Sequence, residues 1–384
     1  MFTTRRCVHL SVLAVCAVAA MLTPVYSAYK GHADDRDVEA VLAAYPALKG
    51  TPVDSCATCH LSGRLKDPTA TGGTRSENHC DFCHAVFLRD TRDIRETLNR
   101  YGADYLTSGR DAPAVRALAP KDSDGDGFSN EVEFKRGTNP GDAASNPSMP
   151  FAPSRAYKVS ALKRLSAVVE QTIFLNSTKS RSGDTYDNYR GNILWEILRT
   201  VGVLDIAESV DVLSADGYER TFTLDELKKA WPQGSVVMGL SKQELGDCGW
   251  VSYSARAQDG ASLPSARIML AFEENGKPLA QARLDPTTGR IVGTGPLRAV
   301  VPQFQISPPD LPQRAEASCT ARVALANRFH EDYDHNAGKS SSAVVGIRVK
   351  PLPTGTRDVD WQTPAPRYLV NEEIVFFGAL TVHR

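Results

Sequence analysis

Two Cys-x-x-Cys-His motifs, at residues 56–60 and 80–84, lie in a stretch that is too polar and turn-rich to form a core of its own. Paired thiols at this spacing can form thioether bonds to the two vinyl groups of one haem, and the histidine that follows can bind the iron. The 20 residues between Cys59 and Cys80 also suit a zinc ribbon, but four thiolates that hold zinc need no histidine. We therefore expect two covalently bound c-type haems, with zinc as the alternative. The residues that would hold the haems are Cys56, Cys59, His60, Cys80, Cys83 and His84.

The sixth coordination position of each haem iron needs a ligand from elsewhere in the chain. His79 directly precedes the second motif and His32 lies upstream of the first, so these two are the first choices. His335 could bind a haem from the neighbouring domain, act in docking, or form a hydrogen bond to Asp332 or Asp334 in a turn. Two histidine ligands would favour a low reduction potential, whereas methionine would raise it.

The first residues predict export from the cytoplasm. Arg5 and Arg6 precede an apolar run and Ser27 is a small residue suited to cleavage, so we expect a signal peptide over 1–27 and a periplasmic mature protein. A lipid anchor at Cys16 is the alternative, although the residue before it is bulky where lipoprotein signals carry a small one. Later apolar runs are too short to cross a bilayer, so we expect no stable membrane span in the mature protein.

Cys248 and Cys319 are the cysteines that remain once the leader and the two motifs are set aside. An even number of cysteines in an oxidising compartment suits a disulfide. Two buried free thiols are equally compatible with the sequence.

A connector rich in Pro, Gly and Ser, residues 137–154, divides the chain. Residues 28–150 are rich in Gly, Asp, Thr and Pro, which predicts a small domain of short helices and loops that needs cofactors or metals to hold it together. Residues 151–384 predict a larger domain of mixed helices and strands. The expected fold class is therefore α+β, with a small, mostly helical or loop domain followed by a mixed α/β domain.

Local patterns predict elements in both domains. An Asp-Gly pair at 216–217 and an Asn-Gly pair at 275–276 lie between β-type residues and predict hairpin turns. Thr223 and Glu226 have the spacing of a helix capping box. Helices are expected over 37–50, 94–106 and 191–203, a further apolar-periodic stretch over 161–175, and strands over 297–302, 343–349 and 373–382.

The acidic segment 122–133, DSDGDGFSNEVE, matches the calcium-loop pattern Asp-x-Asp-x-Asp-Gly-x5-Glu without a gap. Four carboxylates this close would repel one another without a cation, and the alternative is a solvated acidic turn. Pro120 leaves little room for a regular entering helix, and no second loop follows, so we expect one structural calcium ion rather than a paired sensor. The expected ligands are the side chains of Asp122, Asp124, Asp126 and Glu133, the carbonyl of Phe128, and Asn130 through a water.

Four motifs of the second half occur in the order found in a known family: the tryptophan-containing segment GNILWEILRTVGV, the hairpin SADGY, the turn ENGKPL and the strand GPLRAVVP. Through them, residues from about 157 to 384 resemble the molybdopterin-binding domain of the sulfite oxidase family, and the resemblance implies that fold. The whole arrangement is similar to bacterial dihaem c-type proteins with a Gly-Glu-Gly-Pro motif, which here reads Gly-Thr-Gly-Pro at 293–296.

The second half departs from that family at the metal ligand. In sulfite oxidases a cysteine thiolate shortly before the tryptophan helix ligates molybdenum, but residues 171–192 contain no cysteine. Asn176 or Ser177 stands in its place, and Cys248 and Cys319 lie too far along the chain to be assumed replacements. We therefore expect the fold to be retained without molybdopterin. The Gly-Thr-Gly-Pro segment could bind an anion through backbone amides, or form a plain turn.

Together these features predict a periplasmic dihaem c-type cytochrome that transfers single electrons, with the second domain serving in docking or binding. One alternative is an oxidoreductase whose second domain binds a cofactor or small oxyanion and passes electrons to the haems. Another is a haem-based sensor or a structural component of a larger electron-transfer complex. Whether the chain is an enzyme stays open. As a cytochrome of the periplasm it would have redox proteins there as partners. Because 44 basic and 45 acidic side chains nearly balance, we expect no nucleic acid among them.

Overall fold

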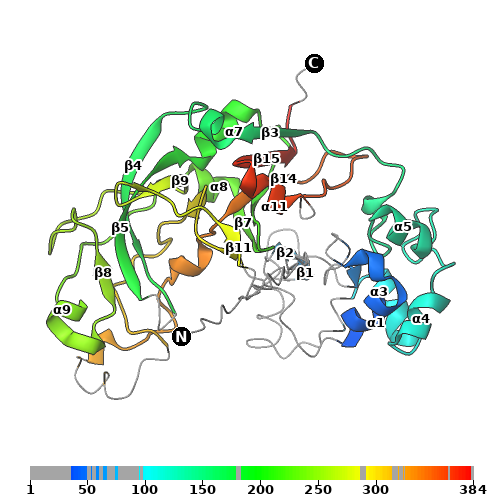
Figure 1. The fold of residues 1–384 in the computed structure, drawn as a ribbon, viewed down its shortest axis with the longest axis horizontal. Coiled ribbons are helices and arrows are strands. Elements are labelled where there is room, and N and C mark those ends of the chain that lie inside the picture. Colours follow the sequence, from blue (N-terminus) through cyan, green and yellow to red (C-terminus); the bar gives the residue numbers. More distant parts are fainter. Residues whose placement is uncertain are drawn as a thin grey trace, which may run out of the picture.

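A computed structural model gives the fold of the chain (Figure 1). Short helices dominate before residue 150 and β-strands dominate after it, so the described part of the chain combines helices and sheets as predicted. None of the helices in that part is long and apolar enough to cross a membrane. The predicted leader at 1–27 lies outside the described residues. The structure describes residues 36–49, 53, 58–59, 64–66, 74–76, 95, 98–178, 183–285, 291–313, 319, 323, 325–361 and 364–381.

The smaller domain is a group of short elements: α1 (Arg36–Ala44), η2 (Pro46–Leu48), β1 (Arg64–Lys66), β2 (Thr74–Ser76), α3 (Arg100–Thr107), α4 (Ala112–Ala117), α5 (Asn130–Arg136) and η5 (Ala143–Ser145). Aromatic rings form the centre of its core. Tyr101 of α3 packs edge-on against Phe134 of α5 with ring centroids 5.4 Å apart, and Tyr45 lies 4.9 Å from Phe134. Each aromatic ring buries a large apolar area, so a few rings can form the core of a small domain.

Helix α3 begins at Arg100, later than the predicted start at residue 94. The side chain of Asn99 accepts a hydrogen bond from the amide of Gly102 at 2.8 Å and so caps the first turn. Asparagine is favoured there because its side chain satisfies a backbone donor that has no partner inside the helix. The predicted helix over 94–106 is therefore confirmed only from Arg100 onward, and the helix predicted over 37–50 ends at Ala44.

Two large β-sheets, one six-stranded and one five-stranded, form most of the larger domain. The six-stranded sheet has the order β10-β9-β5-β4, with β8 paired to β5 and β13 paired to β9. Its strands are β4 (Val168–Leu175), β5 (Asp184–Ile193), β8 (Val251–Tyr253), β9 (Met269–Glu274), β10 (Lys277–Pro278) and β13 (Arg298–Val300). The five-stranded sheet has the order β3-β15-β14-β6-β7, in which β14 and β15 run parallel and the other pairs antiparallel. Its strands are β3 (Ser154–Lys158), β6 (Ser209–Ser214), β7 (Glu219–Thr223), β14 (Val344–Lys350) and β15 (Glu373–Gly378).

Short elements connect these sheets. They are α6 (Val159–Leu162), α7 (Leu194–Val201), α8 (Leu224–Lys228), α9 (Lys242–Leu245), η6 (Gly246–Cys248), β11 (Arg283–Leu284), β12 (Ile291–Val292), η7 (Leu325–Asn327), η8 (Asn336–Lys339) and α11 (Ala365–Val370). The apolar-periodic stretch over 161–175 divides between the end of α6 and the strand β4, whereas the helix predicted over 191–203 is confirmed as α7.

Helix α7 and both sheets share the main apolar core. Leu194 and Leu198 of α7 are fully buried and belong to one cluster with Val212 of β6, Phe272 of β9 and Ile347 of β14. Apolar residues recur every three or four positions along α7, so the helix presents one continuous apolar face to the sheets. This packing ties the two sheets into one folded unit.

Both predicted hairpins are present in the larger domain. The Asp-Gly pair at 216–217 turns β6 into β7, and the Asn-Gly pair at 275–276 turns β9 into β10. Asn275 and Gly276 have φ angles of 51° and 75°, the left-handed values that a two-residue hairpin turn of this type requires. The capping box that starts α8 is confirmed as well, with the amide of Glu226 3.2 Å from the Thr223 hydroxyl.

Arg357 holds the connector between the two domains. Its amide donates to the carbonyl of Pro150 at 2.9 Å, and its Nε donates to the carbonyl of Met149 at 3.0 Å. Its guanidinium lies over the ring of Phe151, 3.9 Å from the centroid. The last residues of the connector are therefore anchored to the larger domain.

Candidate metal centre

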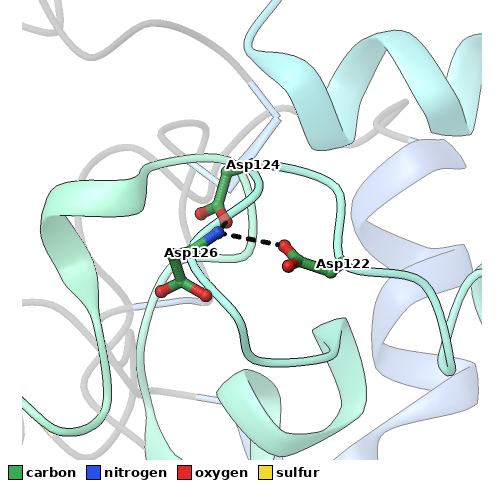
Figure 2. Close-up of side chains that lie close together, drawn as sticks. All are labelled: Asp122, Asp124 and Asp126. Carbon is green, nitrogen blue, oxygen red and sulfur yellow. Dashed lines mark hydrogen bonds between the residues drawn. The ribbon is translucent and has the colours of Figure 1, made fainter.

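The acidic segment 122–133 forms a tight loop after α4 and continues into the first turn of α5 (Figure 2). One carboxylate oxygen from each of Asp122, Asp124 and Asp126 lies within 4.8 Å of the others. Helix α4 ends at Ala117, so no long helix enters the loop, in agreement with the expectation drawn from Pro120. Three of the predicted ligands therefore converge on one point.

Asp122 shapes the loop through hydrogen bonds to the backbone. Its Oδ1 accepts from the amide of Gly125 at 2.7 Å and from that of Asp126 at 3.2 Å, and its Oδ2 accepts from the amide of Gly127 at 2.9 Å. These bonds, that of Gly127 first, hold the pKa of Asp122 below its usual value. Asp122 thereby stays ionised and draws the backbone around the place where a cation would bind.

Four carboxylate oxygens at the loop are buried and have no hydrogen-bond partner among the described residues. They are Oδ2 of Asp124, Oδ2 of Asp126 and both Oε atoms of Glu133. Glu133 lies in the first turn of α5 and is 0% exposed, and Asp124 is 3% exposed. Buried polar atoms are nearly always paired, because an unpaired one loses its hydration without compensation. A cation bound by these oxygens would supply the missing partner.

Burial and neighbouring charges disfavour the ionised forms of the loop carboxyl groups in the absence of a cation. Burial raises the pKa of Glu133 to about 8, and the charges of Asp124 and Asp126 raise it further. Burial also raises the pKa of Asp124 to about 6, with the charge of Asp126 as the next cause. Burial and mutual repulsion thus favour the neutral carboxyl groups, whereas a divalent cation would favour the ionised ones.

Asn130 and Phe128, the other two predicted ligands, make contacts inside the protein. Asn130 is fully buried, and its Nδ2 donates to the carbonyl of Leu118 at 2.8 Å and to the hydroxyl of Ser123 at 3.0 Å. Asn130 therefore holds the two ends of the loop together, and its ligation through a water stays a prediction. The amide of Phe128 donates to Oδ1 of Asp126 at 2.8 Å. A donor set made entirely of oxygen fits calcium rather than zinc or a softer metal.

Most of the predicted haem-binding residues lie outside the described residues, and Cys59 is the exception. The carbonyl of Cys59 accepts a hydrogen bond from the amide of Asn99 at 2.9 Å, and its side chain packs against the cluster that contains Tyr101. The start of α3 thus holds the backbone of the first motif. The predicted residues outside the described ranges are Cys56, His60, Cys80, Cys83, His84, His32 and His79.

His335, the remaining candidate haem ligand, forms a pair with a buried carboxylate. Its Nε2 lies 3.3 Å from both carboxylate oxygens of Asp310, and its ring stacks on Phe329 at a centroid distance of 4.9 Å. The side chain of His335 is 12% exposed and that of Asp310 is fully buried. The partner is therefore Asp310 rather than either neighbouring aspartate of the turn, and with Nε2 in this pair only Nδ1 would remain to bind a haem iron.

Asn176 and Ser177, which stand where the resemblance to sulfite oxidases would place a molybdenum-ligating cysteine, are both buried. Asn176 follows β4, is 0% exposed, and donates through Nδ2 to the carbonyl of Pro308 at 3.2 Å. Cys248 and Cys319, the only cysteines of the larger domain, form a disulfide with Cα atoms 5.0 Å apart. This domain therefore has no thiolate to offer, and its residues do not fit the metal ligation of the sulfite oxidase family.

A second buried carboxylate lies beside this asparagine. Asp184, the first residue of β5, is 0% exposed, and its Oδ1 accepts from the amide of Ser177 at 2.8 Å while its Oδ2 has no partner among the described residues. Burial raises its pKa to about 8, a change that the Ser177 amide opposes and the charge of Asp310 increases. We expect Asp184 to be protonated in the folded protein near neutral pH.

The Gly-Thr-Gly-Pro segment is a turn whose amides are already used. The amides of Thr294 and Gly295 both donate to the carbonyl of Ala280, at 3.0 and 2.7 Å. Of the two alternatives that the sequence allowed, the structure favours the plain turn over an anion site.

Comparisons of the chain with protein-family models, with curated proteins and with solved structures found no match. The function of this protein must therefore be inferred from its own residues.

Sequence reasoning missed two features of these sites. One is the contact of Asn99 with Cys59, for which the only local signal is a capping residue 40 positions after the motif. The other is the pairing of Asp310 with His335 near Asp184, because these residues come from separate parts of the chain. Local sequence patterns carry little information on contacts of that kind.

Proposed function

We propose that this protein is a periplasmic dihaem c-type cytochrome that passes single electrons between redox proteins. The observation that carries the proposal is the pair of Cys-x-x-Cys-His motifs at 56–60 and 80–84. Bound haem iron supplies reversible one-electron transfer, while the chain supplies attachment, iron ligands and a docking surface. The larger domain serves in docking or binding.

Two structural features support this proposal. The disulfide between Cys248 and Cys319 suits an oxidising compartment, and haem attachment through thioethers takes place outside the cytoplasm. The second feature is the hydrogen bond from the amide of Asn99, the N-cap of α3, to the carbonyl of Cys59. This bond gives the attachment segment of a covalently bound haem a defined position in the fold.

A haem count on the purified protein tests the proposal directly. A pyridine haemochrome spectrum and the mass of the intact chain should give two covalent haems. Thiol titration in denaturant without reductant should find no free thiol, because four cysteines carry thioethers and two form the disulfide. Four thiols released on chelation of zinc would instead support the zinc alternative, and stoichiometric molybdenum would support an oxidoreductase.

We also propose that the loop at 122–133 binds one calcium ion that stabilises the smaller domain. Four buried carboxylate oxygens without a hydrogen-bond partner among the described residues support this proposal: one from Asp124, one from Asp126 and two from Glu133. Calorimetric titration of the chelator-treated holoprotein should show one calcium ion bound per chain, with a dissociation constant of about 10⁻⁴ M, as in extracellular modules.

The variant Glu133→Gln tests the ligand assignment. It should weaken calcium binding at least about tenfold, because a neutral amide replaces the carboxylate expected to bind the ion through two oxygens. Glu131→Gln is the matched control, since Glu131 lies on the same helix but pairs with Lys135 at the surface. Equal affinities for the two variants would contradict the assignment.

A further inference from the structure

We infer that the ion bound at 122–133 positions the first haem-attachment segment, through Arg100 and Asn99. This inference rests on the proposed function, in which Cys59 carries a haem thioether and the acidic loop binds calcium. Arg100 and Asn99 are positioning residues here, because neither is a ligand of the ion or of haem iron. Four steps connect the loop to Cys59.

The first step is the contact between the loop and Arg100. The Nη1 of Arg100 donates a hydrogen bond to the backbone carbonyl of Asp124. The same nitrogen would lie 3.4 Å from a Cβ built on Gly125, so the guanidinium rests against the turn of the loop. The side chain of Asp124 lies with those of Asp122 and Asp126 where the ion would bind, while the carbonyl of the same residue accepts from Arg100.

The second step is the pair of hydrogen bonds that Asn99 donates to Thr58 and Cys59. Its amide donates to the carbonyl of Cys59 at 2.9 Å, and its Nδ2 donates to the carbonyl of Thr58 at 2.9 Å. Its Oδ1 accepts from the amide of Gly102, so the same side chain also caps α3. Asn99 is 5% exposed. Because Asn99 and Arg100 are consecutive, the contact that restrains Arg100 lies next to the residue that holds Thr58 and Cys59.

The third step is a contact from the opposite side. A Cβ on Gly141 would lie 2.3 Å from the side chain of Asn99, so the segment after α5 covers that side chain closely. In the same segment, the Nδ2 of Asn146 donates to the carbonyl of Asp126 at 3.4 Å. The loop therefore reaches Asn99 by a second route, through residues 141–146.

The fourth step is electrostatic. With the ion bound, the carboxylates of Asp122, Asp124, Asp126 and Glu133 are held together. With the ion removed, the mutual repulsion of the same carboxylates favours their separation. The carbonyls of Asp124 and Asp126 move with their side chains, and these carbonyls anchor the two routes to Asn99. Calcium occupancy and the order of the Cys59 segment are thus coupled, and thermodynamic linkage makes the coupling reciprocal.

Amide hydrogen exchange on the holoprotein, with calcium and with excess chelator, tests the inference. Removal of calcium should speed exchange at the Asn99 and Gly102 amides about tenfold, within the ordinary range of coupling between sites. The Soret circular dichroism should change in the same titration, because it reports on the surroundings of the haems. In Arg100→Gln, calcium should still bind, but exchange at Asn99 should respond to it less than about threefold.

The control is Arg136→Gln, which makes the same chemical change on an exposed residue of α5. It should behave as the wild-type protein does. If calcium protects the Gly125 and Gly127 amides while Asn99 exchange stays constant in the wild type, the coupling is wrong and the calcium site stands. If no amide of the loop responds and no calcium binds, the calcium site itself is wrong.

Discussion

Arg348 and Asp211 face each other on neighbouring strands β14 and β6, and the Nε of Arg348 donates to Oδ2 of Asp211 at 2.8 Å. The same guanidinium bonds to Glu219 and Asp358, and Lys350 lies 2.9 Å from Asp211. Burial favours the neutral form of Asp211, but Arg348 and Lys350 outweigh it and hold the pKa at about 2. Arg348, Lys350, Asp211, Glu219 and Asp358 thus form a network of ion pairs on the five-stranded sheet.

Replacing Arg348 with methionine should lower the free energy of unfolding by about 3–5 kcal/mol, because the buried Glu219 would lose its ion pair with Arg348 and Asp211 would keep only Lys350. Chemical denaturation followed by circular dichroism measures the change. Arg256→Met is the control, since Arg256 forms an exposed pair with Glu170 that should contribute less than about 1 kcal/mol. Similar losses for the two variants would mean that the network is screened by solvent.

Asp184 should make stability depend on pH. Its pKa is raised to about 8 in the folded protein, mainly by burial, against about 3.9 in the unfolded chain. Between these values the folded protein keeps a proton that the unfolded chain has lost, so stability is highest below pH 4 for this group and falls as pH rises toward 8. The slope from this group is at most about 1.4 kcal/mol per pH unit.

Unfolding free energies at several pH values between 5 and about 8 check this dependence. Asp184→Asn should flatten the profile, because the amide does not titrate beside Asp310 and His335. Asp205→Asn, at an exposed position, should leave the slope as it is in the wild type. A wild-type slope that persists in Asp184→Asn would assign the dependence to another group.

Gly102→Ala should destabilise the smaller domain. A Cβ at this position would lie 2.0 Å from the carbonyl oxygen of Cys59 and 2.9 Å from the side chain of Leu98. Alanine favours helix over glycine by about 1 kcal/mol, but the steric overlap should outweigh this, for a net loss of about 1–3 kcal/mol. The thermal unfolding of the Soret signal measures it. Gly338→Ala is the control, because its Cβ would meet no atom within 4 Å.

The disulfide should contribute strongly to the stability of the larger domain. Cys248 and Cys319 are 71 residues apart, and closing a loop of that length stabilises the folded state by about 4 kcal/mol in the chain-entropy model. The double variant Cys248→Ser with Cys319→Ser should unfold at correspondingly lower denaturant concentration. Alkylation of the native protein without reductant should leave both cysteines unlabelled, and labelling of either would contradict the pairing.

The parts of the fold that were predictable are those in which neighbouring residues determine the backbone. The Asn-Gly and Asp-Gly turns, the capping box at Thr223 and the apolar face of α7 each depend on interactions within a few positions. The acidic loop belongs with them, because twelve consecutive residues carry the whole pattern. Interactions between residues a few positions apart leave a characteristic spacing of residue types in the sequence.

Features formed by distant residues were not predictable in the same way. Local apolar spacing over 94–106 does not show that Asn99 would leave the helix to hold Cys59. The pair formed by Asp310 and His335 has no local signature, since each residue alone resembles a solvated loop residue. Asn130 matched a ligand position by spacing, yet its amide ties the loop to Leu118. Each of these side chains makes its contacts because it is buried, and which side chains are buried depends on the complete fold.

The Cys248–Cys319 disulfide encloses every strand from β8 to β13 in one covalent ring. A protease that cuts the chain once inside this ring would open it without releasing a fragment. The nicked protein would gain only the mass of one water and would migrate as one species until a reductant separated the pieces. Limited proteolysis compared with and without reductant would therefore show which exposed bonds lie inside the ring and which lie outside it.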